Sequence, residues 1–406
     1  MTRITHIDSS INVDSIIHGR YGGDMGTAGL EGVVAASTRL SHVDGERGEL
    51  VIAGFALEDI AAHATFEETT WLMWHGELPT RAELDAFRAA LSDAREIPES
   101  TMTVLRECAR RNLDAMDALR MGVDTLSLVV NDEIGIVSRV PTIVAAYARL
   151  RRGLQPLAPR GELGHAANVL YMLSGEVPDP ERVRGLETYL NTVIDHGLNA
   201  STFTARVITS TGSDLVSAVV GALGALKGPL HGGAPGPALD MVFEIGDASR
   251  AEEVLRRKLE AGERLMGFGH RVYKVRDPRA DVLAKAAERL FTRGGDMSLY
   301  TLARAVEAQA IRLLEEYKPG RRLQTNVEFY TALLLHGLGF ETSLFTPTFA
   351  IGRVSGWIAH ALEQRRANRI IRPQSEYVGP RDKKFVPLPE RGQRDVARSM
   401  EVGLRR

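Results

Sequence analysis

Cysteine is nearly absent from this chain, since Cys108 is the only one in 406 residues. An intrachain disulfide is therefore excluded, and a lone cysteine fits a reducing compartment such as the cytoplasm. An excess of charge of one sign is also lacking, because the formal net charge is −2. That balance argues against a nucleic-acid-binding surface over the whole molecule.

Long hydrophobic runs are missing as well. The longest, residues 215–226, is interrupted by Ser217 and by glycines. It falls short of the roughly 20 residues that a membrane-spanning helix needs. The first ten residues, MTRITHIDSS, lack the apolar core of a signal peptide. We therefore expect a cytoplasmic protein without a membrane anchor.

Several motifs of common cofactor sites do not occur. The chain has no H-E-x-x-H, no paired C-x-x-C and no close Cys/His cluster, which argues against a zinc site. It has no G-x-x-x-x-G-K-[ST] phosphate loop and no G-x-S-x-G nucleophile motif. The segment GFGHRV holds only a G-x-G fragment, without a third glycine or a preceding strand. These absences argue against a zinc site, a P-loop and a dinucleotide-binding site.

What the chain does contain is a succession of helical signals. Thr65 with Glu68, and Thr80 with Glu83, fit capping boxes, in which side chains satisfy the free N–H groups of a first helical turn. Residues 38–55 alternate around an Asp-Gly turn and predict a small β-hairpin. Further helices are expected over residues 141–151, 164–172, 187–196, 213–226, 251–266, 278–291 and 299–317.

The fold class predicted from this pattern is mainly α, because the chain shows no βαβ alternation and no repeat of 20–50 residues. The polar, glycine-rich residues 1–28 predict an irregular N-terminal arm. Two glycine- and proline-containing seams, Gly232–Pro237 and Lys318–Thr325, are candidate domain boundaries. A small helical domain hinged on a larger one would fit these seams.

Two histidines stand out because glycines surround them. His231 lies in GPLHGG and His270 in GFGHRVYK. Glycines remove side-chain bulk, so that a substrate can approach both the imidazole and the backbone N–H groups. A neutral imidazole can donate a hydrogen bond to an oxygen on which charge develops. The alternative is a buried or loop histidine bonded to backbone, and the spacing alone names no reaction.

A basic stretch follows near the C-terminus. Its arginines could bind carboxylates or phosphates with two parallel hydrogen bonds. The alternative is a solvated, basic helix face, and sparse aromatic residues give RNA binding little support. Its members are Arg353, Arg365, Arg366, Arg369, Arg372, Arg381, Lys383 and Lys384.

Five segments, in order and at similar spacing, resemble the citrate synthases of the shorter bacterial and archaeal dimeric type. They are GLEGVVAASTRLSHVDGERGELVIAGF, DHGLNASTFTARVITST, GALKGPLHGGA, GFGHRVYKVRDPRA and FTPTFAIGRVSGWIAHALEQRRANRIIRPQSEYVG. The resemblance covers roughly residues 29–380, and 2-methylcitrate synthases share nearly all of it. It implies a homodimer whose subunit has a large helical domain, residues 29–233 and 331–406, and a small mobile one, residues 234–330.

The function implied is a Claisen-type condensation of acetyl-CoA with oxaloacetate, followed by hydrolysis of the thioester to citrate and CoA. No metal or redox cofactor takes part. By motif, His231 matches the histidine that stabilises the enol of acetyl-CoA, and His270 the one that polarises the ketone of oxaloacetate. The remaining matches are His196, Arg279 and Arg353 in a clamp on the dicarboxylate, Arg372 donated by the partner subunit, and Lys274 at a position that contacts CoA phosphate.

One departure concerns the catalytic base, which in the family is the aspartate of N-V-D. Here Asn326-Val327 is followed by Glu328, and Leu323-Gln324-Thr325 replaces the tyrosine-proline often found before the motif. A glutamate can still abstract a proton. Its extra methylene moves the carboxylate by about 1 Å, a displacement that can cost on the order of 100-fold in rate. We predict a working synthase with Glu328 as base.

Two alternatives stay open on the sequence alone. A 2-methylcitrate synthase uses propionyl-CoA, and a hydrophobic pocket discriminates one methylene only weakly. A weakly catalytic paralogue that binds oxaloacetate or CoA in a regulatory role is the other, and only Glu328 supports it.

Overall fold

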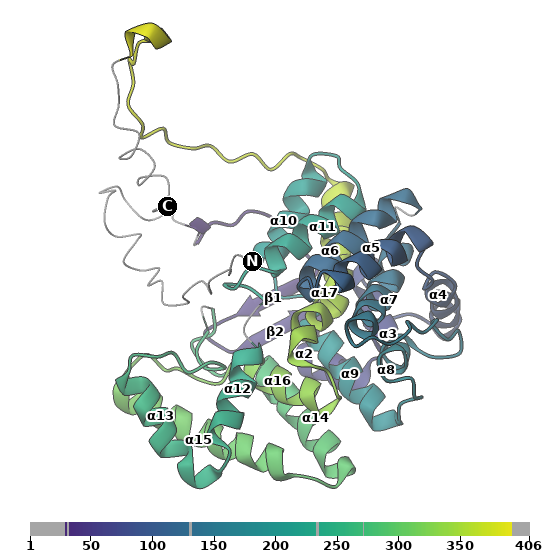
Figure 1. Ribbon diagram of the computed structural model, residues 1–406, viewed down its shortest axis with the longest axis vertical. Coiled ribbons are helices and arrows are strands. Elements are labelled where there is room, and N and C mark those ends of the chain that lie inside the picture. Colours follow the sequence, from purple (N-terminus) through teal and green to yellow (C-terminus); the bar gives the residue numbers. More distant parts are fainter. Residues whose placement is uncertain (1–28, 31, 130–131, 233–234, 271, 392–406) are drawn as a thin grey trace. The chain divides into compact units, whose positions relative to one another are not determined.

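The alternating runs around the Asp-Gly turn pair as antiparallel strands in the computed structural model (Figure 1), which describes residues 29–30, 32–129, 132–232, 235–270 and 272–391. Strand β1 (Ser41–Asp44) pairs with β2 (Glu49–Ile52), and β3 (Phe55–Ala56) continues the sheet in the order β1-β2-β3. The predicted hairpin is confirmed. The predicted arm at residues 1–28 lies outside the described residues.

The turn of this hairpin is fixed by its aspartate. The Asp44 carboxylate accepts hydrogen bonds from the backbone N–H groups of Glu46 at 3.0 Å and Arg47 at 2.9 Å. Gly48 follows with a φ of 70°, a conformation that glycine adopts without steric cost. The shape of the hairpin turn is therefore set by contacts within the turn itself.

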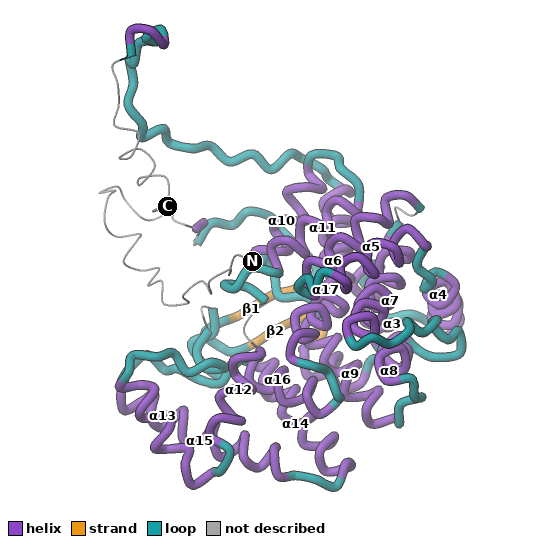
Figure 2. Tube along the Cα trace, viewed as in Figure 1, coloured by secondary structure: helices purple, strands orange, loops and turns teal. Residues whose placement is uncertain are grey.

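Helices make up most of the remaining described chain (Figure 2), and the mainly α fold predicted from the sequence is confirmed. The α-helices are α2 (Leu57–His63), α3 (Phe66–His75), α4 (Arg81–Asp93), α5 (Glu99–Arg110), α6 (Ala115–Asp124), α7 (Glu133–Arg151), α8 (His165–Ser174), α9 (Pro180–Val193), α10 (Ala200–Ser210), α11 (Leu215–Leu226), α12 (Pro235–Ile245), α13 (Ala251–Glu260), α14 (Pro278–Gly294), α15 (Ser298–Tyr317), α16 (Val327–Gly337) and α17 (Phe345–Arg366). Short 3₁₀ turns are η2 (Thr125–Leu128), η3 (Ala248–Arg250), η4 (Thr342–Leu344) and η5 (Leu388–Glu390).

Local capping signals explain where several helices begin. Both predicted capping boxes are present, with Thr65 and Thr80 accepting from the third backbone N–H of α3 and α4. Helix α9 begins earlier than expected, because Asp179 caps it and Pro180 occupies its first position. Helix α7 also begins earlier than expected and runs through Pro141, the residue at which its start is predicted.

The glycine- and proline-rich seam at residues 232–237 is partly helical. Helix α12 begins at Pro235 and contains Gly236 and Pro237 in its first turn. Proline is tolerated there because the first N–H groups of a helix have no intrahelical partner. The other seam, Lys318–Thr325, lies between α15 and α16 and is not helical.

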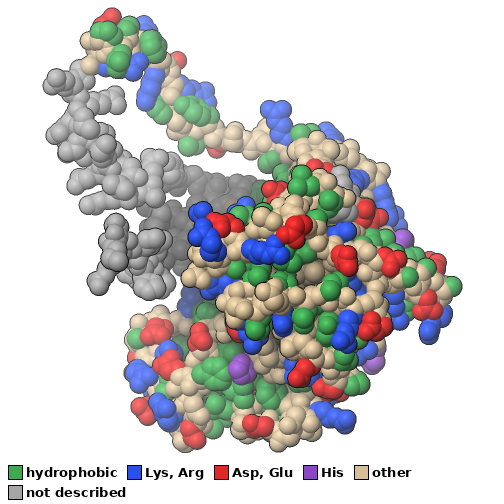
Figure 3. Space-filling model, turned by 45° about the vertical axis from the view of Figure 1, so that its right-hand side comes forward, with side chains coloured by type: hydrophobic (Ala, Val, Ile, Leu, Met, Phe, Trp, Pro, Cys, Tyr) green, Lys and Arg blue, Asp and Glu red, His purple; other side chains and the backbone are tan. Residues whose placement is uncertain are grey.

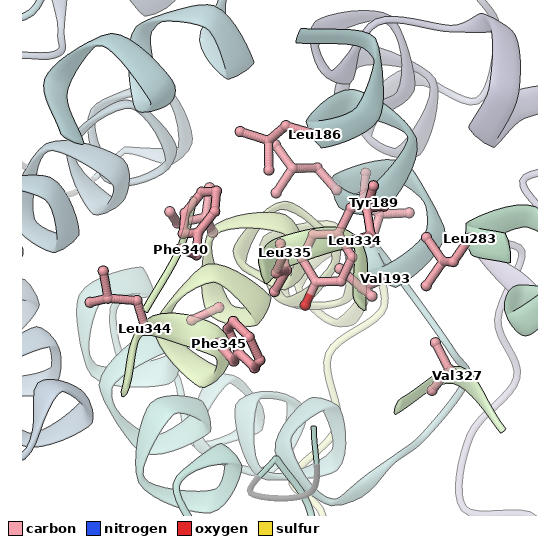
Figure 4. Close-up of a cluster of buried hydrophobic side chains, with 14 of the residues drawn as sticks. Leu186, Tyr189, Val193, Leu283, Val327, Leu334, Leu335, Phe340, Leu344 and Phe345 are labelled. Atoms are coloured by element: carbon pink, nitrogen blue, oxygen red, sulfur yellow. The ribbon is translucent and has the colours of Figure 1, made fainter. Parts of the chain in front are cut away.

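Helix α17 lies at the centre of the fold, where it contacts α3, α6, α7, α9, α10 and α11. Nearly all of its length is buried, including Arg353 and His360. The hydrophobic core continues into α9 and α16, where Leu186 and Tyr189 lie together with Leu334 and Leu335 (Figure 4). Several of the candidate site residues lie at or near the ends of helices that pack in this core.

The described residues fall into two units. Residues 29–369 form one compact unit, and residues 370–391 belong to a second one. On the face of the first unit seen in Figure 3, positive and negative side chains are interspersed. No helix of the described chain is long and apolar enough to cross a membrane.

Candidate active site

Six of the predicted site residues line one cavity of about 810 Å³ in the first unit. They come from the end of α9 and the turn after it, the loops around His231 and His270, and helices α14, α16 and α17. The six residues are His196, His231, His270, Arg279, Glu328 and Arg353. Tyr189, Val193 and Val327, seen in Figure 4, form part of the cavity wall. Segments far apart in the sequence therefore meet at one place.

The ring of His270 is oriented by its own loop. Its Nδ1 accepts hydrogen bonds from the backbone N–H groups of Val272 and Tyr273, both at 3.0 Å. Burial and the nearby Arg279 lower the pKa of His270 to about 4, so the ring is neutral near pH 7. Because Nδ1 accepts, the single proton of the neutral ring is on Nε2.

The Nε2 of His270 lies 3.2 Å from Nη2 of Arg279. Both atoms carry hydrogens, so neither accepts from the other. Two donors therefore converge on one region of the cavity. Such a pair suits an acceptor oxygen on which negative charge develops.

Arg279 is held in place by a buried carboxylate. Asp277 accepts from its Nε at 3.0 Å and its Nη2 at 2.8 Å, and both side chains are at most 5% exposed. Asp277 also accepts from the backbone N–H of Val327 at 3.2 Å. The same carboxylate thus links the start of α14 to the start of α16.

His231 is oriented by the first turn of α10. Its Nε2 lies 2.8 Å from the Ser201 hydroxyl and 3.4 Å from the Ser201 backbone N–H, which can only donate. Nε2 is therefore the acceptor, and Nδ1 carries the proton. Trp357 of α17 donates to the Ser201 hydroxyl at 3.1 Å. Burial and the charge of Arg353 lower the pKa of His231 to about 4.

His196 follows α9 and faces the same loop as His270. Its Nε2 lies 3.1 Å from the Tyr273 hydroxyl, and its ring is edge-on to His270 with centroids 5.7 Å apart. Burial, together with the charges of Arg279 and Arg353, holds the pKa of His196 well below 6.5. All three imidazoles of the site are therefore neutral at neutral pH.

Arg353 supplies a second cation. It is 1% exposed, donates from Nε to the carbonyl oxygen of Val193, and lies 4.8 Å from the ring centroid of Phe349. Burial lowers the pKa of Arg353 to about 10, which leaves it charged near pH 7. Arg279 and Arg353 give the cavity two guanidinium groups, which suits a ligand with two carboxylates.

Glu328 lies in the first turn of α16, capped by Asn326, whose side chain accepts from the Glu328 backbone N–H at 3.0 Å. Its carboxylate forms no hydrogen bond or ion pair with the other residues that the structure describes. Burial raises the pKa of Glu328 to about 7, although Arg279 and Arg353 oppose the shift. An ionised, unpaired carboxylate of this pKa is suited to accept a proton near neutral pH.

The other two predicted site residues lie elsewhere. Lys274 is exposed and does not line the cavity, while its backbone N–H donates to the carbonyl oxygen of Gly45 at 2.8 Å. Arg372 belongs to the second compact unit, whereas the cavity lies within the first. The roles predicted for both stay predictions.

Sequence reasoning missed three residues that orient the site, Ser201, Tyr273 and Asp277, and one that lines the cavity, Tyr189. A signal existed for Asp277, because an aspartate before a proline at the first helical position is a typical helix cap. Tyr273 lies only three residues after His270. Ser201 is 30 residues from His231, and nothing in its local sequence pairs the two.

In the described chain, no group of three or more His, Cys, Asp or Glu side chains is arranged to hold a metal ion.

Comparisons with known proteins bear on this site. The family model "Citrate synthase, C-terminal domain" matches residues 29–374. Citrate synthase 2 of Bacillus subtilis (strain 168) is 41% identical over 377 residues, which cover 90% of this chain and 99% of the relative. A 2-methylcitrate synthase of Mycobacterium tuberculosis (strain H37Rv) is 40% identical over 364 residues, covering 86% of this chain and 90% of the relative.

A solved structure has a similar fold. It is the ternary complex of carboxymethyl coenzyme A and oxaloacetate with citrate synthase from the archaeon Thermoplasma acidophilum. The sequences are 31% identical, the TM-score is 0.82, and the alignment covers 90% of this chain and 99% of that one.

Proposed function

Because this chain belongs to the citrate synthase family, we propose that it condenses acetyl-CoA with oxaloacetate and hydrolyses the product to citrate and CoA. The family resemblance and the acyltransferase class predicted from the sequence are confirmed by these matches. The observation that carries the proposed chemistry is the cavity that His231, His270 and Glu328 line together with two buried guanidinium groups.

The first step is removal of a proton from the acyl methyl group by the Glu328 carboxylate. The electron pair of the broken C–H bond forms a carbon–carbon double bond, and charge moves to the thioester oxygen. The Nδ1–H of His231 donates to that oxygen and stabilises the enol. Preorganised donors of this kind contribute about 3–4 kcal/mol each in other enzymes.

In the second step the enol carbon bonds to the ketone carbon of oxaloacetate. The ketone oxygen becomes an alkoxide, which the Nε2–H of His270 and the guanidinium of Arg279 stabilise and which then takes up a proton. That uptake balances the proton that Glu328 removed from the methyl group and releases again before the next turnover. Arg279, Arg353 and His196 hold the two carboxylates, so the ketone is presented to the enol in one orientation. Water then adds to the thioester, the C–S bond breaks, and CoA leaves as the thiol.

We propose that residues 234–330 form a small domain that closes over the substrates. His270 and Arg279 belong to this part of the chain, whereas His196, His231 and Arg353 belong to the rest. Closure of this part over the substrates would exclude water from the enol. In this proposal Lys274 contacts CoA phosphate, and Arg372 reaches the site of the partner subunit in a homodimer.

The proposed reaction needs no metal or redox cofactor, because neutral imidazoles and guanidinium groups supply the donors. We also propose that the protein works in the cytoplasm, where the lone Cys108 would stay reduced.

A second candidate is the use of propionyl-CoA, favoured by the 40% identity to a relative named 2-methylcitrate synthase. The two acyl groups differ by one methylene, which a pocket distinguishes by about 1–3 kcal/mol. Tyr189, Val193 and Thr331 line the same cavity as Glu328, and in this proposal their side chains limit the room for the extra methyl group.

The test is CoA release from acetyl-CoA or propionyl-CoA with oxaloacetate, followed with a thiol reagent, from which the buried Cys108 is shielded. We expect turnover with wild type and a loss of about 100- to 10,000-fold in Glu328→Gln, the usual contribution of a general base. Glu315→Gln, an exposed glutamate on α15, is the matched control. Oxaloacetate binding without CoA release from either thioester would contradict the proposal and favour a weakly catalytic paralogue.

A further inference from the structure

Another buried carboxylate, that of Glu307 on α15, belongs to a residue that does not line the cavity. It is 4% exposed, and each of its oxygens accepts two hydrogen bonds. Oε1 accepts from the hydroxyl of Thr325 at 2.6 Å and from Nη1 of Arg276 at 2.7 Å. Oε2 accepts from the hydroxyl of Tyr330 at 2.5 Å and from Nη1 of Arg304 at 2.7 Å.

Two of these donors lie on either side of Glu328. Thr325 precedes it by three residues and Tyr330 follows it by two, and both are at most 1% exposed. Glu307 therefore holds the first turn of α16 from both ends. These contacts keep the pKa of Glu307 below 4.5 in spite of its burial, so that it is ionised near pH 7.

Thr325 is also paired with the loop of His270. Phe268 and Thr325 form an isolated antiparallel bridge, with Gly269 N–H donating to Gln324 at 2.7 Å and Asn326 N–H donating to Gly267 at 3.0 Å. A contact that holds Thr325 in place therefore also holds the backbone of the His270 loop and of the first turn of α16, which carries Glu328.

Another of the four donors to Glu307, Arg276, lies next to the residues that orient Arg279. It directly precedes Asp277, whose carboxylate holds Arg279 and the backbone N–H of Val327. Glu307 thus joins the segment that orients Arg279 to the helix that carries Glu328.

We propose that Glu307 is a positioning residue, which fixes the carboxylate of Glu328 relative to His270 and Arg279. The inference rests on the proposed function, in which Glu328 is the base.

A purely structural role of Glu307 predicts a loss of activity that is the same whether or not Glu328 is present. Removing one partner of a buried ion pair leaves an uncompensated charge and is strongly destabilising, so a loss of stability alone does not separate the two roles. If Glu307 acts through Glu328, its removal must matter only while Glu328 is present. Residues that act as a unit are non-additive, and a double-mutant cycle measures that coupling.

The experiment measures kcat and the KM for oxaloacetate in Glu307→Gln, in Glu328→Ala and in the double variant, with Glu315→Gln as control on the same helix. If the base is displaced by about 1 Å, the turnover rate of Glu307→Gln should fall by about 10- to 100-fold. We expect the KM to change by less than about 3-fold, since Asp277 still holds Arg279 and the Val193 carbonyl still holds Arg353. In the Glu328→Ala background the same change should alter the residual rate by less than about 2-fold.

An equal loss in both backgrounds would overturn the proposal, as would an unchanged turnover rate in Glu307→Gln. Thr325→Val removes one donor and keeps the carboxylate, so it gives the same cycle with a milder change if Glu307→Gln does not fold. A wild type that releases no CoA would instead count against the proposed function, whatever the variants do.

Discussion

The raised pKa of Glu328 predicts that this carboxylate lowers the stability of the protein at the pH where it works. Burial raises the pKa from 4.5 to about 7, so ionisation costs more in the folded chain than in the unfolded one. The free energy of unfolding is therefore highest below pH 4.5, where Glu328 is protonated in both the folded and the unfolded chain. It falls as the pH rises to about 7, because the unfolded chain ionises this carboxyl group first. The difference between 4.5 and about 7 corresponds to a loss of about 3 kcal/mol in the free energy of unfolding above pH 7.

Replacement by glutamine keeps the shape and removes the ionisation. Glu328→Gln should therefore gain up to about 3 kcal/mol relative to wild type on going from pH 5 to pH 8. With an unfolding entropy of about 2.1 cal/mol/K per residue, this amounts to about 3–4 °C in thermal midpoint for a chain of this length. The comparison between the two pH values removes any constant effect of the amide.

The assay is thermal unfolding of wild type, Glu328→Gln and the control Glu315→Gln at pH 5 and pH 8, together with the pH profile of kcat/KM. The acid limb of that profile should fall near pH 7, because only the ionised base accepts the proton. A glutamine variant whose relative stability is the same at both pH values would refute the reasoning, and so would activity that stays constant down to pH 5.

Three further outcomes follow from contacts in the site. Asp277→Asn removes the negative charge that holds Arg279 and should raise the KM for oxaloacetate at least about 10-fold, as steady-state kinetics would show; an unchanged KM would mean that Arg279 keeps its place alone. His231→Ala removes a donor to the thioester oxygen and should lower the turnover rate by about 100- to 1,000-fold, and unchanged turnover would exclude the proposed enol step. Gly356→Ala would place a Cβ 2.0 Å from the Ile194 carbonyl oxygen, so we expect a loss of about 1–3 kcal/mol in chemical denaturation. Gly294→Ala, where a Cβ meets nothing within 4 Å, is the control, and equal stability of the two would contradict the packing argument.

Those parts of the fold that depend on short-range signals could be predicted from the sequence. The capping boxes at Thr65 and Thr80 and the Asp44 turn involve residues only two to four positions apart, so their partners are visible locally. The first two turns of helix α7 escape prediction, because Pro141 by itself favours a helix start. Asp132 caps the helix instead, by accepting from the backbone N–H of Gly135.

In the site, too, local sequence marked some residues, whereas the partners that orient them come from distant segments. The glycines around His231 and His270 marked both histidines, the motif marked Glu328, and the structure brings all three to one cavity. The partners that orient these side chains could not be predicted, because they come from distant segments. Ser201 lies 30 residues from His231, and Glu307 lies 18 residues from Thr325 and 31 from Arg276. Such contacts depend on how whole helices pack, and no local pattern encodes them.

The bridge between Phe268 and Thr325 has a consequence for how acyl preference can evolve. A substitution that shifts the first turn of α16 to admit a larger acyl group also pulls on the loop of His270, because Asn326 donates to both Gly267 and Gly269. If His270 binds oxaloacetate as proposed, such a substitution would alter oxaloacetate binding at the same time. The lining residues Tyr189 and Val193 lie outside the bridge, so a change of acyl preference at these positions would leave the coupling between the two loops intact.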